Sequence, residues 1–206
     1  MTLLAFRSAM GMDGSPNPKP VLTASYTLTA ATNLNSLVTP SFTPFDNEVI
    51  VVKISTENQG QPTIGTPTGG SLTYTQRALT NNASSCAGAI YTAVVGTSPG
   101  SMTVTVPFTG STGFHSATVE RWSNAALAAT PATTAVNLAT GTAPSTTITT
   151  VGNNSVVSWL SGDWSASSPT TRAYRSGAVE EAPKQQHPPG EEVRRVSFWG
   201  SILGRR

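Results

Sequence analysis

The sequence predicts an all-β protein, with a β-sandwich or jelly-roll-like body and an irregular arm at each end. Apolar and polar residues alternate with a period of two in many short segments, which is typical of strands with one buried face. Sequences rich in Gly, Pro, Asn and Ser separate these segments, as in antiparallel sandwiches. No window of helical length carries a 3.6-residue period, and the best one, SNAALAAT, is short.

The clearest strand is the segment MTVTVPF. Met102, Val104, Val106 and Phe108 fall on one face of this strand, and we expect that face to be buried. The proline between the last two of these residues indicates an edge strand or the end of a strand.

The segment EVIVVKIS predicts a second strand with one buried face. Alternation places Ile50, Val52 and Ile54 inward, and it places Lys53 and Ser55 outward. The preceding TPFDN is a turn-forming cluster, so we expect the strand to begin directly after it.

Eight further segments are strand candidates because β-branched and aromatic side chains suit a pleated surface. They are TASYTLT, SLVTPSF, LTYTQRAL, AGAIYTAVV, HSATVERWS, TAVNLAT, STTITTV and NSVVSWLSGDW. Turn-forming sequences lie between them, namely GQPTIGTPTGG, TNNASS, GTSPG and VGNNS. Many short strands separated by such turns favour a sandwich or jelly roll.

The distribution of charge divides the chain into three parts. From Arg172 onward lie seven of the twelve basic residues, with four glutamates and three prolines that break any long helix. The segment up to Pro20 is also irregular in composition. We therefore expect an N-terminal arm at residues 1–20, a β-sandwich body at 21–171, and a C-terminal arm or final strand at 172–206.

The content of charged residues is low. Asp, Glu, Lys and Arg make up 11% of the 206 residues, against roughly 25% in an average soluble domain. A net charge of +2 is too small to indicate a nucleic-acid or membrane partner through long-range attraction. The single cysteine, Cys86, excludes an internal disulfide and a cysteine-based zinc site. Without the apolar run of a secretory signal or a membrane span, we expect synthesis in a cytoplasm.

One hydrolase motif occurs in the chain. The residues GTSPG match the G-x-S-x-G nucleophile elbow around Ser98. That elbow must open a helix, whereas the alternating MTVTVPF follows here, so a hairpin turn is expected. A serine nucleophile also needs a base, and His115 lies in a predicted strand with no orienting acid nearby in sequence. We therefore expect no catalytic residues, and a hydrolase ranks last among the functions considered.

The carboxylates and potential metal ligands of the sequence do not indicate a catalytic or metal site either. Asp46, Glu48, Glu57, Glu120 and Asp163 would serve glycoside hydrolysis only if two of them flanked one cleft. We expect most of them to be surface charges. No cluster of His, Asp and Glu has the spacing of metal ligands, so neither a metal nor another cofactor is expected.

The tryptophans suggest carbohydrate binding as an alternative function, because sugar rings stack on exposed aromatic faces. Trp159 lies inside the apolar run VVSWL, and we expect it in the core. Trp164 follows a strand and adjoins Asp163, so this pair is the candidate glycan contact.

Several segments resemble one group of proteins. The stretches LNSLVTPSFTPFDNEVIVVKIS, SLTYTQRA, AGAIYTAVV, ATVERWSNAA and NSVVSWLSGDWSASSP are similar to recurrent β-rich virion proteins of tailed bacteriophages, especially those that infect actinobacteria. The resemblance runs from about Tyr26 to Trp164 and covers structural motifs. It implies a component of the phage particle, on the capsid surface or in the tail, and it implies no catalytic residues. Such proteins continue past SGAVEE through further strands, whereas this sequence has one more apolar stretch.

That last stretch, VRRVSFWGSIL, is the candidate docking segment. An open sheet edge exposes unpaired backbone groups, and a charge-poor body has few side chains with which to protect it. Paired glutamates and arginines beside the stretch suit a polar rim around an apolar contact. We expect this arm to dock on an adjacent subunit, ahead of the alternative that it forms a last strand of its own sheet. The docking residues are Val193, Arg194, Arg195, Val196, Phe198, Trp199, Ile202 and Leu203.

The sequence thus predicts a structural component of a tailed-phage virion and not an enzyme. We expect a capsid decoration or minor capsid protein, assembled into the virion in the host cytoplasm through sheet edges and arms. Its expected partners are the major capsid protein, other virion proteins and further copies of itself. The alternatives are a minor tail protein and a lectin-like module that binds host surface glycans.

Overall fold

The computed structural model describes residues 2–8, 19–30, 34–57, 63–81, 86–109, 115–126, 134–136, 156–161 and 198–203. These ranges contain strands, turns and bends and no helix, which confirms the predicted all-β class. The described strands are β1 (Thr2–Ser8), β2 (Val21–Ala30), β3 (Ser36–Val38), β4 (Val49–Glu57), β5 (Thr63–Ile64), β6 (Thr75–Asn81), β7 (Cys86–Val94), β8 (Thr105–Thr109), β9 (His115–Ser123), β10 (Ala125–Ala126), β11 (Thr134–Val136), β12 (Val156–Ser161) and β13 (Phe198–Leu203).

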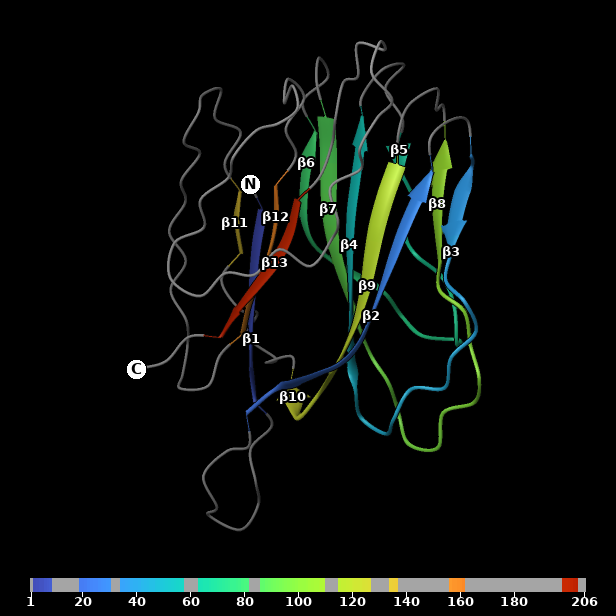
Figure 1. The fold of residues 1–206 in the computed structure, drawn as a ribbon, viewed down its shortest axis with the longest axis vertical. Helices are drawn as coiled ribbons and strands as arrows, with labels where there is room; N and C mark the ends of the chain where they lie inside the picture. The colour runs from blue at the N-terminus through green and yellow to red at the C-terminus, as the bar shows by residue number, and fades with distance from the viewer. Residues whose placement is uncertain are drawn as a thin grey trace, which may run out of the picture.

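Five strands form a central antiparallel sheet in the order β2-β9-β4-β7-β6 (Figure 1). Strand β4 lies in the middle and pairs along its length with β9 on one side and β7 on the other. The predicted turn before β4 is present at Asp46 and Asn47, where Asn47 has a φ of 59°. Each of these five strands falls on a segment that the sequence predicts as a strand.

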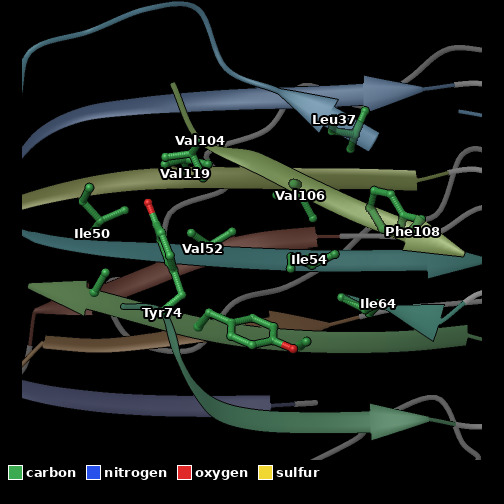
Figure 2. Close-up of a cluster of buried hydrophobic side chains, with 14 of the residues drawn as sticks. Leu37, Ile50, Val52, Ile54, Ile64, Tyr74, Val104, Val106, Phe108 and Val119 are labelled. Carbon is green, nitrogen blue, oxygen red and sulfur yellow. The ribbon is translucent and has the colours of Figure 1, made fainter. Parts of the chain in front are cut away.

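A smaller antiparallel sheet, β3-β8-β5, packs on one face of the central sheet (Figure 1). The main hydrophobic core lies between the two sheets. Its buried side chains include Leu37, Ile50, Val52, Ile54, Val104, Val106, Phe108 and Val119 (Figure 2). The predicted inward faces of the segments EVIVVKIS and MTVTVPF are therefore confirmed.

A third sheet, β10-β1-β12-β13 with β11 also paired to β1, covers the opposite face of the central sheet (Figure 1). Strand β12 contacts β4 and β7, and β1 contacts β6 and β7. Gly88 of β7 marks a close approach, because a Cβ atom added there would lie 2.9 Å from Leu160 Cδ2 of β12. The described strands are thus arranged in three layers with β4 in the middle one.

This third sheet corrects the prediction that Lys53 and Ser55 of β4 point outward into solvent. Their side chains do lie on the opposite face from Ile50 and Ile54, but both are buried, with 0% and 1% of their surface exposed. Alternation gives the face on which a side chain lies, but it does not show whether a second layer covers that face.

The two ends of the chain also differ from the prediction. Residues 2–8 form β1, paired with β12 on one side and with β10 and β11 on the other, so the N-terminal segment is not irregular throughout. The run LLAF is apolar without alternation, so a period of two gives no signal for this strand. Strand β13 pairs with β12 of the same chain from Val156↔Leu203 to Ser161↔Phe198, which is the alternative that the sequence ranked second. Most of residues 172–206, and the predicted strand STTITTV, lie outside the described residues.

Candidate functional site

Half of the charged residues in the body, residues 21–171, lie inside the fold. Between residues 21 and 171 the sequence contains eight Asp, Glu, Lys and Arg residues, namely Asp46, Glu48, Lys53, Glu57, Arg77, Glu120, Arg121 and Asp163. Four of these eight form two ion pairs inside the fold, Lys53–Glu120 and Arg121–Glu48. Few charges therefore remain for the surface of the body.

The neighbours Glu120 and Arg121 of β9 connect the two ion pairs. Successive side chains of a strand point to opposite faces, so this dipeptide places its acid and its base on different sides of the central sheet. Arg121 lies on the side of the main core, where its guanidinium is 5.3 Å from the centre of the Phe42 ring. Glu120 lies on the side of the third sheet, with Lys53.

Both carboxylate oxygens of Glu48 in the Arg121–Glu48 pair accept hydrogen bonds. Arg121 donates from Nε to Glu48 Oε2 at 2.8 Å, and its second nitrogen lies 2.7 Å from the same oxygen. The backbone N–H of Phe45 donates to Oε2 at 3.0 Å, and the Thr23 hydroxyl donates to Oε1 at 2.5 Å. The Arg121 guanidinium also lies over both the Phe42 and Phe45 rings. This geometry ties β2, β4, β9 and the turn before β4 together, and it leaves no carboxylate oxygen directed at a substrate.

The Lys53–Glu120 pair is fully buried between the central and third sheets. Lys53 Nζ contacts Glu120 Oε1, and both side chains have 0% of their surface exposed. The indole N–H of Trp122 donates to the other carboxylate oxygen, Oε2, at 3.0 Å. Two of the five carboxylates considered from the sequence, Glu48 and Glu120, are therefore not surface charges, because each meets a cation inside the fold.

His115 is held by its neighbours at the start of β9. Its Nδ1 lies 2.7 Å from the hydroxyl of Thr56, and its ring stacks on Phe108 with centroids 4.2 Å apart. Burial lowers the pKa of the His115 imidazole below its usual value of 6.5. These contacts fit the expected structural role of a strand histidine with a satisfied ring.

We expect the pKa of His115 to make folding sensitive to acid. The unfolded imidazole takes up a proton near pH 6.5, whereas the folded one does so only at lower pH, so stability is lost as pH falls from 6.5 through the folded pKa. Urea unfolding between pH 8 and pH 5 measures this loss. The variant His115→Gln should have a flatter profile, whereas His187→Gln should keep the wild-type profile. A flatter profile in His187→Gln, together with an unchanged profile in His115→Gln, would contradict the prediction.

The G-x-S-x-G motif forms a bend, but it is not the expected hairpin turn, because β7 before it and β8 after it belong to different sheets. Ser98 has a φ of 54°, and its backbone N–H donates to Asp46 Oδ1 at 2.8 Å. This bend follows β7 at the end of the sheet where β4 begins, whereas His115 pairs with Thr56 near the other end of β4. The seven residue-to-residue steps from Val49 to Thr56 span roughly 23 Å of strand. Ser98 and His115 therefore do not form a nucleophile–base pair.

Several predicted site residues lie outside the described part of the chain. The candidate glycan pair, Trp164 and Asp163, does so, and the glycan-binding alternative stays a prediction. The same holds for the docking residues Val193, Arg194, Arg195 and Val196. Phe198, Trp199, Ile202 and Leu203 belong to β13, whose backbone pairs with β12. Trp159 of β12 is buried, which confirms its expected place in the core.

The two border strands of the central sheet, β2 and β6, are the candidate surface for contact with another protein. Strands β2 and β6 each pair with one described strand, β9 and β7 respectively. The sequence of β2, VLTASYTLTA, contains no charged residue and no proline. Val21 and Leu22 at its start are 49% and 36% exposed, and Leu79 on β6 is 47% exposed. Among the described strands, neither border has a second pairing partner, and both carry exposed apolar side chains.

The described residues contain no cluster of three or more His, Cys, Asp or Glu side chains that could hold a metal ion. None of the described segments is a helix with the length and apolarity needed to cross a membrane. No protein-family model, no curated protein and no solved structure matches the chain.

Proposed function

We propose that this protein is a structural component of a tailed-phage virion, a capsid decoration or minor capsid protein that binds the particle surface. The observation that carries the proposal is the placement of charge. Two ion pairs take four of the eight charges of the body into the interior, while the borders of the central sheet carry exposed apolar side chains and one charge, Arg77 on β6. Without like-charge repulsion, many copies pack closely on one particle.

Strand β2 is the part of this surface best suited to a protein partner. Edge strands of soluble monomers are usually protected by charged residues, prolines or covering segments, and β2 has no charge and no proline over ten residues. A neighbouring subunit that adds a strand to this border would satisfy its backbone groups. On a symmetric particle, many such contacts of low individual affinity give stable attachment.

The layered core supports a β-sandwich or jelly-roll-like body within the proposed virion protein. The central sheet and the β3-β8-β5 sheet enclose a core of alternating apolar side chains, which is the packing that such folds use. The docking segment at residues 190–206 completes the proposal. Strand β13 ends the order of the third sheet, so its outer border is a further place for a neighbour to bind.

Imaging of the whole particle tests the proposed location. Gold-labelled antibodies against the purified protein, applied to phage particles from the host, should label the capsid surface. Label confined to the tail would replace the capsid role with the minor tail alternative. Particles that contain the protein by mass spectrometry but bind no label call for cryo-electron microscopy. Absence of the chain from purified particles would overturn the proposal.

Deletion of residues 190–206 tests the docking segment. We expect the truncated protein to join particles with at least tenfold lower occupancy, because the apolar contact and its charged rim are removed. Removal of residues 204–206 alone is the matched control, since it keeps β13 and takes away two arginines. Unchanged occupancy after the larger deletion, in a protein that still folds by circular dichroism, would remove the docking role.

A further inference from the structure

The side chains of Lys53 and Glu120 meet across the two central strands of the middle sheet. Lys53 of β4 pairs directly with Thr118 of β9, and Glu120 pairs with Val51, so the lysine and the glutamate are diagonal neighbours on one face. Such neighbours are within reach of long side chains. Here Nζ of the lysine is in direct contact with Oε1 of the glutamate.

The surroundings of this pair exclude solvent. Both side chains are completely buried beneath the third sheet, and a buried ion pair loses much of its attraction to the cost of desolvation. Thr118 lies opposite Lys53 and Ser55 lies two residues along the same strand, and the hydroxyls of both are also buried without a hydrogen-bond partner among the described residues. An amine and a carboxyl group held in fixed contact react at a high effective concentration.

We propose that Lys53 and Glu120 form an intramolecular isopeptide bond, an amide between Nζ of the lysine and Cδ of the glutamate. A proton passes from the ammonium group to Oε1, and the resulting amine attacks Cδ. The C–O bond to Oε1 then breaks, and one water molecule leaves with that oxygen and two protons from the nitrogen. The ammonium and carboxylate become one neutral amide and one water, so no oxidant or other reactant is required.

Trp122 is placed to assist this step as a positioning residue. Its indole N–H donates to Glu120 Oε2, the oxygen that stays on the carbon and becomes the amide oxygen. A donor fixed on that oxygen stabilises the negative charge that it gains during the attack. It also holds the carboxyl group so that Oε1 remains the oxygen facing the lysine.

The second buried ion pair supplies an internal comparison. Arg121 and Glu48 are also in contact inside the fold, at 2.7 Å, but the delocalised guanidinium is a poor nucleophile that stays protonated. Of the two buried ion pairs in the described part of the chain, Lys53–Glu120 is the one that combines contact with an amine. The resulting bond would join β4 to β9 covalently, and the inference stands whether or not the protein belongs to a virion.

Mass spectrometry of the full-length protein under denaturing conditions tests the bond. We expect an intact mass lower than that of the sequence by one water molecule. Trypsin would otherwise give peptides 8–53, 54–77 and 78–121, because Lys19 precedes a proline and resists cleavage. With the bond, residues 8–77 should appear as one peptide joined to residues 78–121. The full mass together with cleavage after Lys53, in folded protein incubated until its spectrum is constant, would overturn the proposal.

Two variants assign the chemistry to these residues. Lys53→Arg keeps the cation but should restore the full mass, whereas Arg77→Lys, at a cation that is hydrogen-bonded to Thr92 Oγ1, should leave the loss of one water unchanged. A loss of water that persists in Lys53→Arg would place the modification elsewhere and refute the assignment. Trp122→Phe keeps an aromatic ring without the donor. In protein that is purified unfolded before the bond forms and is then refolded, this variant should lose water at least tenfold more slowly than the wild type. An unchanged rate in Trp122→Phe would overturn the positioning role of the indole.

Discussion

Replacement of Arg121 by methionine is expected to lower the free energy of unfolding by about 3–5 kcal/mol, the cost of leaving a buried charge without its partner. Glu48 is fully buried and accepts hydrogen bonds from the guanidinium, from a threonine hydroxyl and from a backbone N–H. Methionine fills part of the space but donates nothing to the carboxylate. Urea unfolding monitored by tryptophan fluorescence measures the change.

Two comparison variants separate charge from packing at this site. Arg121→Lys keeps the positive charge but loses the two-pronged contact and the stacking between Phe42 and Phe45, so it should cost less than methionine. The double variant Arg121→Met with Glu48→Leu removes both charges and should recover part of the loss. If the single variant Arg121→Met were as stable as the wild type, the buried pair would not hold the strands together as described.

The sequence predicted the central sheet well because its strands each have one side against the main core. Alternation in the segment around Ile50, Val52 and Ile54 gives the face that packs on the β3-β8-β5 sheet. The third sheet was missed because β1 carries a continuous apolar run without that period, and because the pairings of β1 with β10, β11 and β12 join segments more than a hundred residues apart. Local patterns do not encode such pairings.

The buried ion pairs could have been found only in part from the sequence. Opposite charges at Glu120 and Arg121 within a predicted strand imply one charge on each face of a sheet. That signal, combined with the lysine on the covered face of β4, indicates at least one interior charge. The partners themselves depend on which strand lies beside β9, and this is a property of the sheet order.

The interior pairs and the uncharged borders have a common physical consequence. Inside the fold, ionic contacts tie β9 to β4 and to the turn before β4, so the middle layer is held by more than apolar packing. Outside, the borders at β2 and β6 carry little charge to oppose a neighbouring strand. Buried ionic contacts together with sparsely charged sheet borders support the proposed role of this protein as a subunit of a larger assembly.

Replacement of Gly69 by alanine is the second substitution with a large expected effect. Gly69 lies in the connection between β5 and β6 and has a φ of 142°, a backbone conformation that residues other than glycine rarely adopt. A Cβ atom there would overlap the carbonyl oxygen of Thr103 in the chain leading to β8. Backbone strain of about 1–3 kcal/mol and steric overlap of about 1–3 kcal/mol together predict a loss of roughly 4 kcal/mol.

The effect of Gly69→Ala should be specific to this position and to the backbone. Gly100→Ala is the matched control, because a Cβ atom there meets nothing within 4 Å, and its free energy of unfolding should stay close to that of the wild type. Adding Thr103→Gly to Gly69→Ala should give no rescue, since the overlap is with a main-chain oxygen and not with the threonine side chain. Thr68 next to Gly69 forms a two-way backbone bridge with Thr105, which prevents the connection from moving away. Equal stability of the Gly69→Ala and Gly100→Ala variants would show that this connection does not press against the β8 segment.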